Sequence, residues 1–211
     1  MPEILSNKDK KILQGKIGGR EKDIYHHPLK ENKIYIFLKE NYPTINQIKG
    51  RYYLTKILHI LFPQNIPDIY AVVKNNNAII VTEKKFVNDE FNLKYHTKNK
   101  YRFYARKIKF DPKFQRFISA LENLGIHPDV SNMKNFAYVD DEIVYLDNSF
   151  LPWKIDKIKR SIRVLYDYNK IKEAIESLSE LNDKKEGASL FKKIRRIKGS
   201  RNEIIYKWLM F

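Results

Sequence analysis

The sequence predicts an α+β protein with a β-rich first lobe that contains one long helix, followed by a mostly helical second lobe. Two observations support this prediction. Strand-like segments are concentrated in the first part of the chain, whereas apolar residues in the second part recur mainly at helical spacing. The chain has 211 residues, of which 43% are hydrophobic, and this is enough for one core or for two small lobes. We expect the lobes to span residues 1–83 and 84–211.

A glycine cluster and a strand open the first lobe. Three of the 7 glycines are Gly15, Gly18 and Gly19, which favours a loop where the backbone approaches a ligand closely. Residues 33–39 alternate and are rich in β-branched and aromatic side chains, so they predict a strand. Residues 41–44 then end the strand and offer a helix N-cap.

One long helix and a hairpin complete the first lobe. Apolar side chains recur at helical spacing between residues 45 and 62, and Pro63 ends the pattern. The strand-like segments 66–73 and 78–81 flank an Asn-rich turn. They predict a hairpin that ends near Glu83.

The second lobe begins with an irregular segment and a well-marked helix. Residues 84–110 are polar, basic and aromatic with no clean period, so a linker, a loop or an edge strand at 101–108 all stay open. Asp111 is then a suitable N-cap and Pro112 a suitable first helical residue. Gly125 is the expected terminator of this helix.

A second hairpin and basic helices follow. Two short strands, 136–139 and 143–146, are separated by an Asp-Asp turn. From about residue 156 onward the chain is helical and basic, with breaks expected near 182–183 and 199–200.

Charge is the strongest compositional signal. With Lys+Arg 41 against Asp+Glu 25, the net charge of +16 favours a polyanionic partner such as nucleic acid or nucleotide. The alternative is a coding bias that spreads lysine over an ordinary surface. The absence of cysteine excludes disulfides, thiolate metal sites and a thiol nucleophile. Because the start lacks a signal-peptide pattern and no apolar stretch could span a bilayer, we expect a soluble, cytoplasmic protein.

Three segments of the second lobe together form a catalytic-loop pattern. They are Leu124–Asp129 (Leu-Gly-Ile-His-Pro-Asp), Asn132–Phe136 and Ile143–Ser149, the last of which contains Asp147. With the glycine cluster, the strand that ends in Lys39 and the helix after it, this order resembles the protein-kinase-like superfamily. The short second lobe is similar to the compact atypical members, of RIO type or like antibiotic phosphotransferases.

The resemblance implies phosphoryl transfer with ATP and Mg²⁺ as cofactors. It implies that Asp129 orients or deprotonates the acceptor hydroxyl. It also implies that Asp147 holds Mg²⁺ together with Asn135 or Asn132. Carboxylate and amide oxygens are the ligands that this hard cation prefers.

The resemblance also implies the nucleotide contacts. Backbone N–H groups of the three clustered glycines would approach the phosphates. The ammonium of Lys39 would face the α- and β-phosphates, with Lys33 as a rival for that role. Glu83 would lie in the hinge whose backbone meets the adenine.

Departures from the family pattern leave a second reading open. The family has a metal-binding Asn five residues after its catalytic Asp, but that position here is Lys134. The family also has Phe-Gly after its metal-binding Asp, whereas Asn148 and Ser149 follow Asp147. No glutamate lies between residues 41 and 82, so the helix expected there has none to form the ion pair that would hold Lys39 in place. The alternative is therefore a pseudokinase with a vestigial cleft, or a non-catalytic module that binds RNA or a ribonucleoprotein.

Two basic segments are candidates for nucleic-acid binding. In residues 98–109, basic and aromatic side chains alternate, and binding and core packing are equally good interpretations. The C-terminal run is denser and favours contact with RNA or a ribonucleoprotein. Its residues are Lys192, Lys193, Arg195, Arg196, Lys198 and Arg201.

Overall fold

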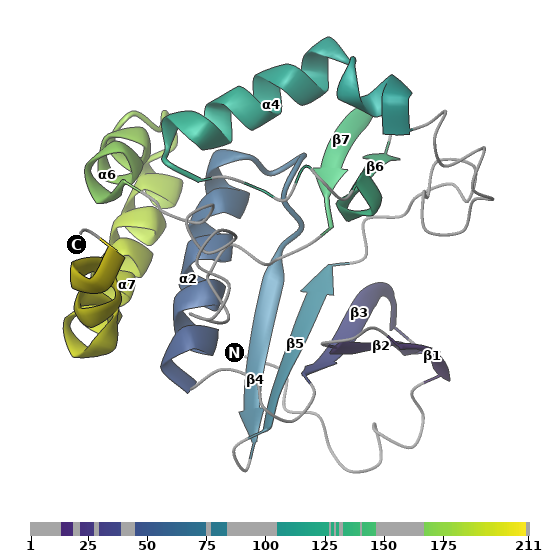
Figure 1. The fold of residues 1–211 in the computed structure, drawn as a ribbon, viewed down its shortest axis with the longest axis horizontal. Coiled ribbons are helices and arrows are strands. Elements are labelled where there is room, and N and C mark those ends of the chain that lie inside the picture. Colours follow the sequence, from purple (N-terminus) through teal and green to yellow (C-terminus); the bar gives the residue numbers. More distant parts are fainter. Residues whose placement is uncertain are drawn as a thin grey trace.

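A computed structural model describes most of the chain, and it has a mixed α+β fold (Figure 1). This confirms the predicted α+β class. The described residues are 14–18, 22–27, 30–38, 45–74, 77–83, 105–126, 128, 130, 133–139, 141–146 and 167–209.

The strands before residue 84 form one antiparallel sheet in the order β1-β2-β3-β5-β4. Its central strand β3 contributes Tyr35 and Ile36, whose side chains are buried. The predicted strand at 33–39 and the hairpin that ends at Glu83 are both confirmed, although β3 begins earlier than expected. The strands are β1 (Gln14–Gly18), β2 (Lys22–His27), β3 (Lys30–Leu38), β4 (Ile69–Lys74) and β5 (Asn77–Glu83).

Helix α2 (Ile45–Leu61) connects β3 to β4 and confirms the long helix expected there. It lies between β4 and the C-terminal helix, and it packs against both (Figure 1). One side carries Tyr52, which packs with Ile36 and Ile69 of the sheet. Lys56 ties the helix to the start of β4 through an ion pair of 2.6 Å with Asp68.

Helix α4 (Pro112–Asn123) has the capping residues that the sequence predicts. The Asp111 carboxylate accepts a 2.7 Å hydrogen bond from the backbone N–H of Lys113. Gly125 has a φ of 73°, the left-handed conformation that a helix terminator requires. Four apolar side chains of one face are buried: Phe114, Phe117, Ile118 and Leu121.

Residues 105–109 form a helical turn before α4, so the edge-strand alternative is wrong for the described part of 101–108. The backbone N–H of Phe110 donates to the carbonyl of Arg106 at 3.1 Å, which is a helical bond. Only Ile108 of this turn is fully buried. A strand with alternating sides would bury every second residue.

The second hairpin is confirmed as β6 (Phe136–Val139) and β7 (Glu142–Tyr145), preceded by the short 3-10 helix η2 (Met133–Asn135). The turn contains Asp141 with a φ of 66°. Aspartate tolerates this left-handed conformation better than most residues do.

The C-terminal helices are α6 (Tyr168–Glu176) and α7 (Leu181–Leu209); the break expected near 182–183 exists but lies a few residues earlier, and the break expected at 199–200 is wrong. The break lies at residues 177–180. Asp183 belongs to the first turn of α7, where its carboxylate complements the helix dipole and so favours the start of a helix over a break. The backbone of α7 also continues through 199–200. A single glycine costs a helix about 1 kcal/mol and does not have to end it.

The main core joins elements that are distant in sequence. Side chains from α2, the 105–109 turn, α4, the β6–β7 hairpin, α6 and α7 form one cluster, whereas Ile36 and Ile69 form a small separate one. The α2 contribution to the main cluster is Leu54, Ile57 and Leu58. No helix among the described residues is long and apolar enough to cross a bilayer.

Candidate functional site

The β6–β7 hairpin is the part of the predicted site that the structure describes best. Its two ends are held together by a 2.7 Å hydrogen bond from the backbone N–H of Leu146 to the carbonyl of Asn135. Asn135 is half-buried and is one of the two residues proposed from the sequence as a metal ligand. Leu146 immediately precedes Asp147 in the chain.

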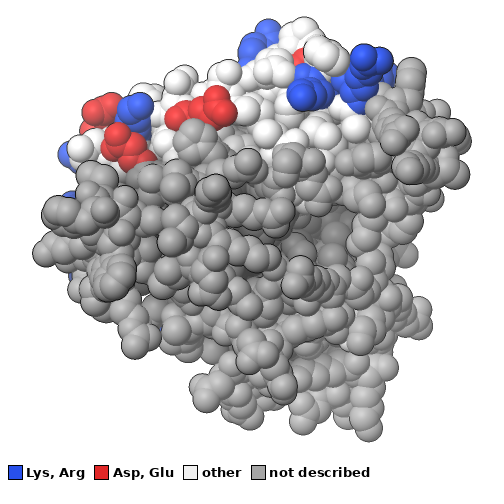
Figure 2. Space-filling view, viewed as in Figure 1, with Lys and Arg blue, Asp and Glu red and all other residues white. Residues whose placement is uncertain are grey.

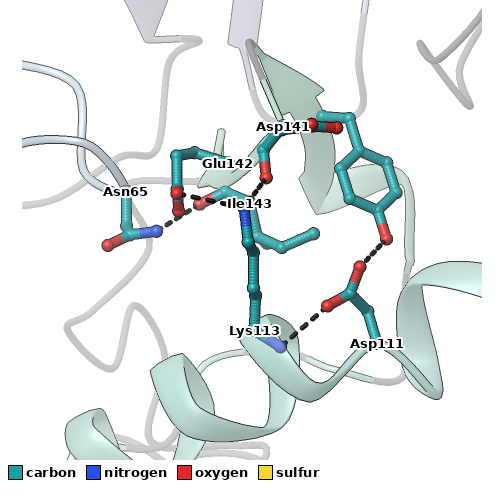
Figure 3. A network of polar contacts seen from close by, with 7 residues as sticks. Asn65, Asp111, Lys113, Asp141, Glu142 and Ile143 are labelled. Carbon is teal, nitrogen blue, oxygen red and sulfur yellow. Dashed lines mark hydrogen bonds and ion pairs between the residues drawn. The ribbon is translucent and has the colours of Figure 1, made fainter.

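One side of the hairpin is fixed by Asn65, from the connection between α2 and β4 (Figure 3). The Asn65 side-chain amide donates to the carbonyl of Ile143 at 2.7 Å. The backbone N–H of Tyr145 donates to the carbonyl of Asn65 at 2.8 Å. These bonds link a residue before the sheet strand β4 to a hairpin that lies 78 residues later.

The other side of the hairpin is fixed by the start of α4 (Figure 3). The Lys113 ammonium donates to the carbonyl of Asp141 at 2.7 Å and lies 3.3 Å from a carboxylate oxygen of Glu142. The hydroxyl of Tyr138 donates to the carboxylate of Asp111. The hairpin is thus bonded to the α2–β4 connection on one side and to the start of α4 on the other.

The Tyr138–Asp111 hydrogen bond shifts the pKa of both groups. The hydroxyl of Tyr138 stabilises the charged carboxylate and so holds the pKa of Asp111 below its usual value. Burial, and then the hydrogen bond to Asp111, raise the pKa of Tyr138. Tyr138 is therefore a neutral donor and Asp111 an ionised acceptor at neutral pH.

The glycines predicted to form a phosphate loop lie partly in a strand. Gly15 and Gly18 belong to β1, and Gly19 lies outside the described residues. The register of β1 against β2 shifts between Gln14 and Ile17, and Gly15 lies in that irregular stretch. Glycine is common at such irregularities because it has no side chain to pack.

The sheet register separates the glycine end from the proposed hinge. Gly18 pairs with Asp23, and Asp23 pairs with Phe37 near the end of β3. Glu83, the last residue of β5, instead pairs with Lys33 near the start of β3. The Lys33 ammonium lies 5.3 Å from the ring centroid of Tyr70, so the rival lysine is directed toward β4.

Lys39, Asp129 and Asp147 lie outside the described residues, and so does Asn132. Lys39 follows directly on the last residue of β3. Among the described residues, no three His, Asp or Glu side chains group together as a metal site would.

Helix α7 exposes the basic residues that the sequence singles out. Leu190, Phe191 and Ile194 are buried, whereas Lys192, Lys193, Arg195 and Arg196 are exposed. The Lys193 ammonium lies 5.7 Å from the ring centroid of Tyr53 on α2. Lys198 and Arg201 belong to the same helix, and their side chains lie outside the described part of the structure.

Sequence reasoning missed Asn65, Lys113 and Tyr138 as residues that fix the hairpin. Local signals for them were weak, since an Asn between two prolines indicates only a turn. No protein-family model matches the chain, and no curated protein matches it either.

Proposed function

We propose that the chain is a compact protein-kinase-like phosphotransferase or ATPase that binds Mg–ATP between two lobes. The observation that carries this proposal is the element order. Along the chain, α2 lies between strands β3 and β4 of the antiparallel sheet. Helix α4 and then the β6–β7 hairpin follow. The residues with the catalytic-loop pattern flank that hairpin in sequence.

One backbone hydrogen bond of the hairpin supports the proposed metal ligands. The hydrogen bond between Leu146 and Asn135 brings the residue before Asp147 next to Asn135. An amide oxygen and a carboxylate are the oxygen donors that suit Mg²⁺. When bound, the ion would neutralise charge on the nucleotide phosphates.

The remaining roles follow from the same proposal. Asp129 would accept the proton of the attacking hydroxyl. Lys39, which follows the last residue of β3 in the sequence, would neutralise phosphate charge, and the glycines of β1 would leave space for the phosphates. Glu83 would mark the hinge.

The test is the thermal midpoint with and without Mg–ATP, for the wild type and Asp147→Ala. A ligand at a hundred times its Kd stabilises the native state by about 2.7 kcal/mol, so the wild type should show a clear rise that the variant loses. Asp141→Asn, in the turn of the same hairpin, is the matched control and should keep the rise. No rise for the wild type at millimolar nucleotide would refute the proposal.

The exposed cations of α7 favour a second candidate function, binding of RNA or a ribonucleoprotein. Lys192, Arg195 and Arg196 are exposed where the opposite face of the helix is buried. Reversing the charge of Arg195 and Arg196 to Glu should abolish binding of an RNA oligonucleotide and leave the effect of Mg–ATP unchanged. Asp147→Ala should do the opposite. Equal effects of either change on both activities would refute two separate sites.

A further inference from the structure

The turn before α4 exposes a phenylalanine beside basic side chains. Phe110 is 72% exposed, more than any other large hydrophobic residue in the described part of the chain. Arg106, Lys109 and Phe110 have the i, i+3, i+4 spacing that places side chains on one side of a helical turn. Ile108 faces the core instead.

The next exposed basic residue along the chain is Arg116 of α4. The side-chain amide of Gln115 donates to the carbonyl of Lys109 at 2.6 Å, which holds the first turns of α4 against the preceding turn. Arg116 follows Gln115 and is exposed. We call Arg106, Lys109, Phe110 and Arg116 the basic-aromatic patch.

No acidic side chain is exposed within residues 105–116, the segment that contains the patch. Between residues 105 and 116 the one acidic residue is Asp111, and its carboxylate accepts hydrogen bonds from Tyr138 and from the Lys113 backbone. In Figure 2 most of the blue side chains lie over the right-hand end of α4, with a little red between them, and most of the red ones lie toward the other end together with further blue ones. The exposed charge of α4 toward its C-terminal end is Glu122.

Neither helix stability nor packing explains this arrangement. Cations near the N-terminus of a helix oppose its dipole, and the carboxylate at this N-terminus is the N-cap Asp111, which already accepts hydrogen bonds from Tyr138 and from the Lys113 backbone. An exposed phenylalanine contributes little to the core. Within the described residues, Arg106, Lys109 and Arg116 form no ion pair, whereas Lys107 lies 5.9 Å from the ring centroid of Tyr138.

We propose that the basic-aromatic patch binds single-stranded nucleic acid. The face of the Phe110 ring would stack on one base, and Arg106, Lys109 and Arg116 would neutralise the adjoining phosphates. A single strand fits because its bases are free to stack on a side chain, whereas a duplex keeps them stacked on each other. The basic-aromatic patch is separate from the cations of α7, and its binding of nucleic acid does not depend on the binding of Mg–ATP.

The test measures fluorescence anisotropy of a labelled ten-nucleotide oligouridine. The full chain carries Arg195→Glu and Arg196→Glu in every variant, so that α7 does not mask the patch. Phe110→Leu should weaken binding about fivefold to 150-fold, because stacking contributes roughly 1–3 kcal/mol per base. Phe110→Tyr, which keeps an aromatic ring, should restore it.

A polyanion without bases separates stacking from charge. Phe110→Leu should leave the affinity for inorganic polyphosphate unchanged. Lys109→Glu should weaken binding of both ligands and lower the salt dependence of oligouridine binding, with a slope change of at least about 0.7 per lost phosphate contact. Lys170→Glu, an exposed lysine of α6, is the matched control and should have little effect.

Three outcomes would overturn the proposal. The first is that the α7-substituted chain does not bind oligouridine. The second is that Phe110→Leu binds oligouridine as tightly as its parent. The third is that the patch binds vesicles of anionic phospholipid in preference to oligouridine and loses them with Phe110→Leu, since this would assign it to a membrane surface.

Discussion

Tyr138 donates a hydrogen bond to a carboxylate that also caps a helix, so a single hydroxyl acts on both the β6–β7 hairpin and α4. Tyr138→Phe keeps the ring, and with it the contact with Lys107, but removes the donor. We expect a loss of about 1–2 kcal/mol in the free energy of unfolding at pH 7, because the acceptor is charged. Urea denaturation measures this difference.

The same substitution should change the pH dependence of stability. Asp111 has a lowered pKa in the folded state, so its contribution is present above the unfolded value of about 3.9 and is lost as the pH falls through the folded value. The stability difference between the wild type and Tyr138→Phe should therefore shrink as the pH falls below about 3.9. A difference that is the same at pH 7 and at acid pH would contradict the assigned role of the Asp111 charge.

At the scale of elements, α6 and α7 meet where α7 has no side chain. A Cβ added at Gly187 would lie 3.0 Å from the Cγ2 atom of Ile175, which is itself buried. Gly187→Val should push the helices apart and lower the free energy of unfolding by about 1–3 kcal/mol, as overpacking commonly does. Ala188→Val, at the neighbouring exposed position, is the control for helix propensity. Similar losses for both variants in urea denaturation would refute a tight contact at Gly187.

The elements differ in how well the sequence predicts them, and the reason is where their signals lie. Helix α4 was predicted with both of its ends because Asp111, Pro112 and Gly125 act on their own backbone. The break between α6 and α7 was misplaced because an Asn-Asp pair fits a helix start as well as a turn.

The candidate site was harder to predict than the helices. The hydrogen-bond partners of Asn65 and Tyr138 lie 78 and 27 residues away, so no local pattern indicates them. The hairpin was predicted from its turn, but the contacts that fix it come from the tertiary fold.

At the scale of the whole molecule, α2 joins the sheet to the rest of the chain. Its residues Leu54, Ile57 and Leu58 lie in the same core as Phe136 and Tyr145 of the β6–β7 hairpin. Its C-terminal connection supplies Asn65, which bonds to the hairpin at two positions. The sheet and the hairpin should therefore lose structure together, because both depend on how α2 is packed.

Asn65→Asp tests this coupling with a change of one atom. A carboxylate cannot donate to the carbonyl of Ile143, and its charge would face that oxygen, so we expect a loss of about 1–3 kcal/mol. Hydrogen exchange of the Tyr145 amide, which donates to the carbonyl of Asn65, should accelerate, and so should exchange in β4. Asn182→Asp, an exposed position in the first turn of α7, is the matched control and should leave both rates unchanged. If exchange accelerated in β7 alone, Asn65 would fix the hairpin locally without coupling it to the sheet.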